Sequence, residues 1–509
     1  MKSIIKSRRP QFATLNKVNG GSFTELVSSI DRSLRKAGWI TAVCAFSIMV
    51  SQESCKKLVD INPPTSSITT SQVFADSSDA VSAVAGIYAS LVNVTSLQFG
   101  TGAITVFCGL SADELRPFST DPQLLRVNTN TLIDDDVSSL WNEAYPIIYQ
   151  CNAVLDGIGS SSAKGINQAT KNQVIGEAKF FRAYLYFYLT NMYGDLPYIT
   201  TIDFKSNTLA RRIPQSQVYS AIVADLLDAQ NLLAADFSLG KGERIRANKG
   251  AATALLSRVY LYMNNTSAAY LQSTSIINNT STYSLASSPN GVFVKNNSEA
   301  ILQFQIKPGT GTDYFNATPE GFLFIPYDAT SPPNYYLSTE FLNSFENGDL
   351  RKSQWIDSTN YSGLTYYYPY KYNVGPAQTS PGGAVSQYTM VLRLAEQYLI
   401  RAECEANGEG GGLPSAIKDL NTIRSRAGLG NLPGNLTSAQ VLAALAQERR
   451  IELFAEWGHR WFDLKRTSQV ANVFKSIDYK NAYQPFQNLY PIPLGDLSTD
   501  PNLTQNPGY

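Results

Sequence analysis

The side chains with the clearest potential for chemistry lie near the C-terminus, in the stretch QERRIELFAEWGHRWFDLKR. Glu448, Glu452 and Glu456 recur at every fourth position, so they share one face of the expected helix. Two carboxylates held close together are what a glycoside hydrolase uses as its acid and its base. Arginines are interleaved with these glutamates, however, and Glu–Arg ion pairs are the commoner outcome. We therefore favour a structural role for the stretch and keep a hydrolase as an alternative.

Histidine and cysteine usage disfavours several other chemistries. His459 is the only histidine in the chain, so a Ser-His-Asp type of hydrolysis would have to depend on this one residue. The five cysteines are widely spaced and form no CxxC or Cys/His cluster, which argues against a structural zinc site and against a disulfide framework. They are Cys44, Cys55, Cys108, Cys151 and Cys404.

Composition points to a globular protein with no preference for a charged partner. The 509 residues are 43% hydrophobic, which suffices for a substantial core, and 29 of them are tyrosine. Lys plus Arg and Asp plus Glu both number 41, so the formal net charge is zero. This balance argues against non-specific binding of nucleic acid.

The best candidate for ligand binding is the tyrosine-rich stretch WIDSTNYSGLTYYYPYKYNVG. Sugar recognition needs flat apolar faces together with amide or charged groups for the hydroxyls. Alternate residues of a strand share one face, so an extended chain would align the even-numbered tyrosines from 366 to 372. The alternative is that half of these rings simply cover the scaffold. The aromatic candidates here are Trp355, Tyr361, Tyr366, Tyr367, Tyr368, Tyr370 and Tyr372, followed by Phe99 and Phe118, and then by Tyr314, Phe315, Tyr335 and Tyr336.

The elements that would position these residues are mostly helices. In residues 172–200, apolar side chains recur at helical spacing on most faces, which predicts a helix buried on most of its surface and ended by GDLP. Further helices are expected at about 71–93, 134–159, 214–236, 248–264 and 390–410, and again over LPSAIKDLNTIRSRAGL. Residues 281–389 contain short strand-like pieces with many Gly, Pro and aromatic residues. We expect loops and short strands there, laid over a helical scaffold.

The N-terminal 54 residues have the pattern of an export signal. Basic residues precede the apolar run WITAVCAFSIMV, which is too short to span a membrane. Cys55 follows Ser54, a small residue of the kind found before a lipidated cysteine, although Gln52 and Glu53 depart from the usual pattern. Two interpretations fit the local sequence: a lipoprotein signal cut before Cys55, or an ordinary signal peptide with an incidental cysteine.

Seven segments in order resemble the SusD/RagB family of outer-membrane nutrient-binding lipoproteins of Bacteroidetes. They are SCKKLVDINPP, VFADSSDAVSAVAGIYASL, GEAKFFRAYLYFYLTNMYGDLPYIT, RLAEQYLIRAECEANG, AIKDLNTIRSRAGL, ERRIELFAEWGHRWFDLKR and LYPIPLGDLSTDPNLTQNPGY. The resemblance covers roughly residues 55–509. The family's lipidated cysteine stands where Cys55 stands, so the resemblance implies a signal peptide at 1–54, a lipidated Cys55 with a tether to residue 70, and a single binding domain at 71–509.

The resemblance also implies a fold and a function. The fold is mostly α, built from tetratricopeptide-like helical hairpins, with an irregular region on the ligand side that we place at 281–389. The function is to capture a glycan at the cell surface and to deliver it to a SusC-like TonB-dependent transporter in the outer membrane, without catalysis and without a cofactor. Calcium occurs in some members, but no acidic loop in this sequence has a calcium-binding pattern. A peptide-binding member, a glycoside hydrolase and a purely structural helical scaffold remain as alternatives.

From these arguments we take seven residues as the predicted ligand contacts. They are Trp355, Tyr361, Tyr366, Tyr368, Tyr370, Tyr314 and Phe99.

Overall fold

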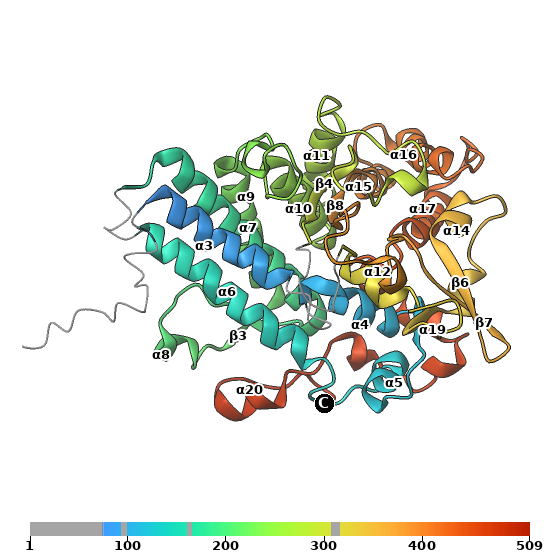
Figure 1. The fold of residues 1–509 in the computed structure, drawn as a ribbon, viewed down its shortest axis with the longest axis horizontal. Coiled ribbons are helices and arrows are strands. Elements are labelled where there is room, and N and C mark those ends of the chain that lie inside the picture. Colours follow the sequence, from blue (N-terminus) through green and yellow to red (C-terminus); the bar gives the residue numbers. More distant parts are fainter. Residues whose placement is uncertain (1–73, 75, 93–98, 160–164, 307–315) are drawn as a thin grey trace, which may run out of the picture. The chain divides into compact units, whose positions relative to one another are not determined.

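The fold is mostly α-helical, as the sequence indicates. A computed structural model describes residues 74, 76–92, 99–159, 165–306 and 316–509. Helices dominate these residues, and the strands are short (Figure 1). None of the helices in the described residues combines the length and the apolar character needed to cross a membrane. Cys55 and the expected signal peptide lie outside the described residues.

The first half of the described chain forms a set of packed antiparallel helices, with α7 at its centre. The helix α7 contacts α6 and α9, α3 packs on α6 and α7, and α10 packs on α9 and α11. These helices are α3 (Ser77–Leu91), α4 (Ile104–Ser111), α5 (Pro122–Thr129), α6 (Ser138–Gly159), α7 (Gln168–Tyr193), α8 (Phe204–Asn207), α9 (Gln215–Leu232), α10 (Lys249–Tyr262) and α11 (Thr266–Ile277).

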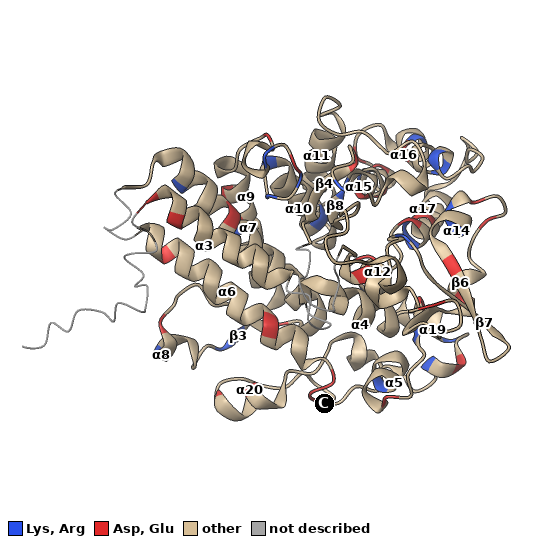
Figure 2. Cartoon of the chain, viewed as in Figure 1, with Lys and Arg blue, Asp and Glu red and all other residues tan. Residues whose placement is uncertain are grey.

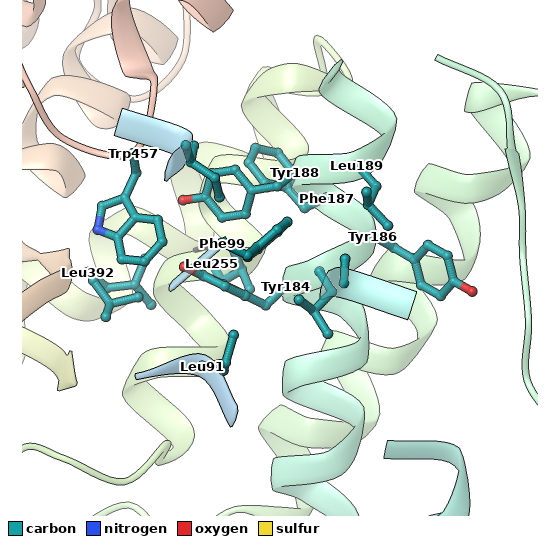
Figure 3. Packing of buried hydrophobic residues seen from close by; sticks show 14 of the residues in the cluster. Leu91, Phe99, Tyr184, Tyr186, Phe187, Tyr188, Leu189, Leu255, Leu392 and Trp457 are labelled. Carbon is teal, nitrogen blue, oxygen red and sulfur yellow. The ribbon is translucent and has the colours of Figure 1, made fainter. Parts of the chain in front are cut away.

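The prediction of a helix buried on most faces is confirmed for α7. Its C-terminal half is almost entirely buried, and Gly194 follows it with a φ of +78°, a conformation that glycine adopts readily. Figure 3 shows Tyr184, Phe187 and Tyr188 of α7 packed together with Phe99 and Trp457 from distant parts of the chain. The ring of Phe99 lies 6.1 Å from that of Tyr188, in edge-to-face geometry. The aromatic content of the sequence is therefore used largely inside the core.

The second half adds further helices, and the described residues of both halves contain four two-stranded antiparallel sheets. The helices are α12 (Pro319–Phe324), α13 (Thr339–Leu342), α14 (Leu350–Gln354), α15 (Leu394–Ala406), α16 (Gly412–Arg426), α17 (Ser438–Glu452), α18 (His459–Arg466), α19 (Val470–Phe474) and α20 (Leu494–Thr499). The strand pairs are β1 (Leu115–Pro117) with β5 (Tyr335–Leu337), β2 (Leu196–Pro197) with β3 (Arg212–Ile213), β4 (Ala300–Phe304) with β8 (Thr389–Arg393), and β6 (Ile356–Tyr361) with β7 (Leu364–Pro369).

Two predicted helix starts differ from the structure. The helix expected from about residue 71 begins at Ser77, because the side chain of Asp76 caps it by accepting from the backbone N–H groups of Ser78 and Asp79. The helix expected from residue 390 begins at Leu394, because residues 389–393 form β8 and pair with β4. In both cases the apolar pattern is correct, and the boundary is decided by a hydrogen bond that the pattern does not contain.

A buried lysine ends α4. The ammonium of Lys480 donates to Leu110 O at 2.7 Å, to Ser111 O at 3.0 Å and to Asn130 Oδ1 at 2.6 Å. Two of these acceptors are carbonyls of the last turn of α4, which have no partner within the helix. A charged side chain that is 1% exposed thus supplies the C-terminal cap.

We expect Lys480→Met to lower the free energy of unfolding by about 3 kcal/mol, because it leaves buried oxygens without a donor. Chemical denaturation monitored by circular dichroism measures this loss. Lys475→Met is the matched control, since Lys475 is exposed and its ammonium contacts only Asn472 at 3.3 Å among the described residues. Equal stabilities of the two variants would contradict a capping role for Lys480.

Candidate ligand-binding site

The hairpin formed by β6 and β7 presents the tyrosine-rich stretch at the surface. Its two-residue turn consists of Ser362 and Gly363, with φ values of +51° and +81°, as tight hairpin turns require. Residues directly opposite each other in an antiparallel pair lie on the same face. Tyr361 lies opposite Leu364 and Tyr366 lies opposite Thr359, so both tyrosines project from one face of the hairpin.

Four aromatic rings from separate segments of the chain meet on that face. The ring of Phe118 lies 5.5 Å from that of Tyr361 and 5.4 Å from that of Tyr366. Tyr336 of β5 lies 5.2 Å from Tyr366. Phe118 directly follows β1, and its backbone N–H donates to Asn334 O at 3.0 Å, which extends the pairing with the β5 segment. We call Phe118, Tyr336, Tyr361 and Tyr366 the aromatic patch.

The aromatic patch is open to solvent. Tyr361 is 36% exposed, and the other three rings are partly exposed. On the opposite face of the hairpin, the Thr365 hydroxyl donates to Asn360 Oδ1 at 2.7 Å, so this amide is not part of the aromatic patch. Edge-to-face packing fixes the rings in place and leaves parts of their faces free. Such an arrangement can stack against sugar rings, and its tyrosine hydroxyls can form hydrogen bonds with the hydroxyls of the sugar.

The structure places two predicted ligand contacts inside the core. Trp355 is 1% exposed, and its indole N–H donates to Pro289 O at 2.9 Å. Phe99 is also 1% exposed and packs against α7. Both predictions are corrected here, because each ring fills space between helices and strands that meet only in the tertiary structure. These two residues are not part of the candidate site.

The expected alignment of four even-numbered tyrosines is only partly correct. The strand β7 ends at Pro369, so the alternation stops after Tyr368. Tyr368 and Tyr372 are both 6% exposed. The hydroxyl of Tyr368 lies 3.3 Å from Asp357 Oδ2, and that of Tyr372 accepts from the backbone N–H of Met390 at 2.8 Å. Tyr370 is partly exposed and packs 6.3 Å from Tyr368, at the base of the hairpin.

Four further aromatic candidates lie outside the aromatic patch or outside the described residues. Tyr367 is 43% exposed, but it projects from the opposite face of the hairpin, next to Ser358. Tyr335 is 7% exposed and packs against Phe324. Tyr314 lies outside the described residues, as does Phe315. Among the seven predicted contacts, Tyr361 and Tyr366 are therefore the two that the structure brings together at the surface.

The acidic stretch at the C-terminus forms a buried ionic network. Glu452 is 0% exposed and accepts from Arg393 at 2.5 Å, from Arg351 at 3.0 Å and from Arg426. Glu448 pairs with Arg351 at 2.5 Å. The expected ion pairs are confirmed, but their partners come from β8, α14 and α16 rather than from the neighbouring arginines. Figure 2 shows acidic and basic segments interspersed where α15 and α17 lie.

Burial and charge together hold this network in its ionised form. Burial raises the pKa of Glu452, but the charges of Arg426, Arg393 and Arg351 outweigh it and hold the pKa well below its ordinary value. The same balance lowers the pKa of Glu456, which accepts from Lys371 at 2.5 Å. A substrate has no access to these carboxylates, so they do not form the acid/base pair of a hydrolase.

His459 gives the fold a specific dependence on pH. Burial lowers the pKa of its imidazole well below the ordinary 6.5, and nearby arginines lower it further. Below pH 6.5 the unfolded chain therefore binds a proton that the folded chain does not, so stability falls as the pH falls. We expect this component to reach about 1.4 kcal/mol per pH unit, and His459→Gln to remove it. Urea denaturation from pH 7 to pH 5 compares the two slopes, and parallel curves would contradict the prediction.

The described residues contain no group of three or more His, Cys, Asp or Glu side chains placed to hold a metal ion. A cavity of about 560 Å³ opens beside the C-terminal part of α3, and its wall includes Tyr88, Arg246 and Gln305. Tyr88 and Arg246 are bound to Glu177, at 2.8 Å and 2.6 Å. The polar groups of this cavity thus serve mainly to join α3, α7 and the segment before α10.

Solved structures of other proteins share this fold. A SusD superfamily protein of Bacteroides vulgatus superimposes with a TM-score of 0.74 at 23% identity, over 85% of this chain and 99% of that one. A laminarin-binding SusD-like protein superimposes with a TM-score of 0.69 at 24% identity, again over 85% of this chain and 99% of the other. At these identities the likeness concerns the fold.

Sequence comparison agrees with this assignment. Residues 353–509 match the model of the SusD family, and residues 118–261 match a model described as starch-binding associating with outer membrane. A SusD-like protein of Formosa agariphila is 27% identical over 89% of this chain and 95% of its own length. The chain belongs to the SusD/RagB family.

Proposed function

We propose that this protein binds an oligosaccharide at the cell surface and delivers it to a TonB-dependent transporter in the outer membrane. The observation that carries the proposal is the aromatic patch, in which Phe118, directly after β1, and three tyrosines from β5, β6 and β7 form an open surface. Neutral sugars suit such a surface, since stacking needs no ligand charge. The laminarin-binding relative supports a glycan as ligand.

The proposed mode of action is capture and release without catalysis. The glutamates that a hydrolase would need are 0–6% exposed and hydrogen-bonded to arginine or lysine side chains. Affinity for the ligand therefore comes from stacking and hydrogen bonds. We propose further that no cofactor takes part.

The anchor belongs to the same proposal. The description of the matching family model supports association with the outer membrane. We propose that the chain is cut before Cys55, that the thiol of Cys55 is lipidated, and that residues 55–70 tether the domain to the membrane. Metabolic labelling with an acyl probe tests this: the wild type is expected to carry label and Cys55→Ala none. Label on the variant, or an unlabelled wild type, would reject the anchor.

Titration calorimetry of the purified protein against a panel of neutral glycans and unstructured peptides tests the binding function. We expect saturable binding to at least one glycan, with no products on chromatography after prolonged incubation. Binding to peptides alone would favour a peptide-binding member of the family. Release of shorter sugars would point to a hydrolase, and binding to no ligand would favour a structural scaffold.

A further inference from the structure

A second cavity, remote from the aromatic patch, lies between α6, the segment that follows α7, and α20. Its volume is about 480 Å³, within the range of small-molecule sites. Figure 1 shows α8 and α20 below α6, on a different part of the fold from β6 and β7. The side chains that carry our argument are Trp141, Tyr145, Tyr149, Phe204, Asp496 and Asp500, all of which line the cavity.

Two of the aromatic side chains are held in place at the bottom of the cavity, and two are exposed to solvent at its sides. Trp141 is 3% exposed, and its ring lies 4.7 Å from that of Tyr145. The hydroxyl of Tyr145 donates to Pro197 O at 2.9 Å, which holds that ring in place. In contrast, Tyr149 is 49% exposed and Phe204 is 77% exposed. Exposing large aromatic side chains to solvent costs free energy, and a group of them marks a place where another molecule binds.

The charge of the cavity is negative. Asp496 and Asp500 line it, and none of its lining residues is Lys or Arg. Neither aspartate belongs to any of the ion pairs found in the described part of the chain. The nearby Arg212 donates instead to the carbonyl oxygens of Asp195 and Thr504, both at 2.9 Å. The cavity therefore has carboxylates without a cation.

The pKa of Asp496 agrees with this charge imbalance. Burial raises it above its ordinary value, and Asp135 and Asp500 raise it further by repulsion, against a hydrogen bond from Trp141. A positive group of the ligand would relieve this repulsion and would also meet the negative faces of the aromatic rings.

We propose that this cavity binds a saccharide with a free amino group. The sugar ring stacks on the aromatic side chains, and Asp496 and Asp500 receive the ammonium group. Thr208 and Thr499 also line the cavity, and their hydroxyls donate to Lys205 O at 3.3 Å and Gly495 O at 3.1 Å, so their oxygens keep lone pairs for sugar hydroxyls. The proposal rests on the glycan-binding function and extends it to a second site and to a charged class of sugar.

An amino sugar fits the cavity better than a neutral sugar or a lysine side chain does. A neutral sugar would use the rings but would leave the two carboxylates without a cation. A lysine side chain would use the carboxylates, but its flexible alkyl chain cannot cover the exposed rings of Tyr149 and Phe204. An amino sugar combines a flat apolar face with an ammonium at a fixed distance.

Calorimetry of the full protein with three probes tests the proposal: a β-1,4-linked glucosamine tetrasaccharide, its fully N-acetylated counterpart and a lysine tetrapeptide. We expect the free-amine sugar to bind at least tenfold more tightly than either of the others. The double variant Asp496→Asn/Asp500→Asn is expected to remove this preference, and Tyr149→Ala to weaken binding of the amine sugar about tenfold. Leu494→Ala is the control, because Leu494 is 51% exposed in the same helix and does not line the cavity.

Equal affinity for the acetylated sugar, tighter binding of the lysine peptide, or unchanged affinity in the aspartate variant would overturn the proposal. The variant Tyr361→Ala/Tyr366→Ala alters the aromatic patch and leaves the lining of the cavity intact, so it separates this proposal from the proposed function. If neutral glycans bind and the amine sugar does not, the second site alone fails. If the amine sugar binds at the cavity and no neutral glycan binds, the aromatic patch alone fails.

Discussion

Glu452→Gln is expected to lower the free energy of unfolding by about 3–5 kcal/mol, the usual cost of breaking a buried ion pair on one side. The side chain is 0% exposed and accepts from Arg351, Arg393 and Arg426. A glutamine keeps the shape, but it removes the charge and turns one acceptor into a donor that faces guanidinium groups. The positive charges of the three arginines would then be incompletely neutralised in a region without solvent.

Thermal and urea denaturation measure this loss, with Asp228→Asn as the matched control. Asp228 also pairs with a cation, Lys179, but its side chain is 54% exposed, so we expect a change below about 1 kcal/mol. The comparison bears on function as well as on stability. A Glu452→Gln protein that is as stable as the wild type, yet has lost a glycan-hydrolysing activity, would contradict both the structural role and the proposed function.

Tyr361→Ala/Tyr366→Ala is expected to weaken glycan binding about a hundredfold. Stacking of aromatic rings contributes about 0.5–1.5 kcal/mol beyond the area that it buries, and the lost area adds to this. About 1.4 kcal/mol per ring corresponds to a tenfold change in Kd for each. Isothermal titration with the tightest glycan of the panel measures the effect.

The control for this prediction is Tyr367→Ala. Tyr367 is 43% exposed and lies on the same strand, but it projects from the opposite face of the hairpin. We expect its removal to change Kd less than threefold. All three tyrosines are partly or well exposed, so the variants should remain folded, which circular dichroism verifies. A larger effect from Tyr367 than from the patch tyrosines would place the glycan on the other face.

Most of the helical scaffold follows from local pattern. The helix α7 is predicted by a continuous apolar stripe, and its end by Gly194 followed by Pro197, because helical spacing and glycine's freedom at positive φ are properties of neighbouring residues. Family membership also follows from motifs read in order. The start of α15 does not follow from local pattern, because residues 389–393 pair with a strand nearly ninety positions earlier.

The binding surface depends on contacts that no local pattern contains. Trp355 and Tyr361 stand in one tyrosine-rich stretch and look equivalent there, yet one fills the core and the other is exposed. The difference arises because Trp355 directly follows α14 and packs against Phe293 and Phe454, whereas Tyr361 ends β6, which pairs with β7 at the surface. The cavity beside α20 joins residues about 350 positions apart, such as Trp141 and Asp496. Chain pattern alone therefore determines the scaffold and its family, whereas long-range packing decides which aromatic and acidic side chains a ligand can reach.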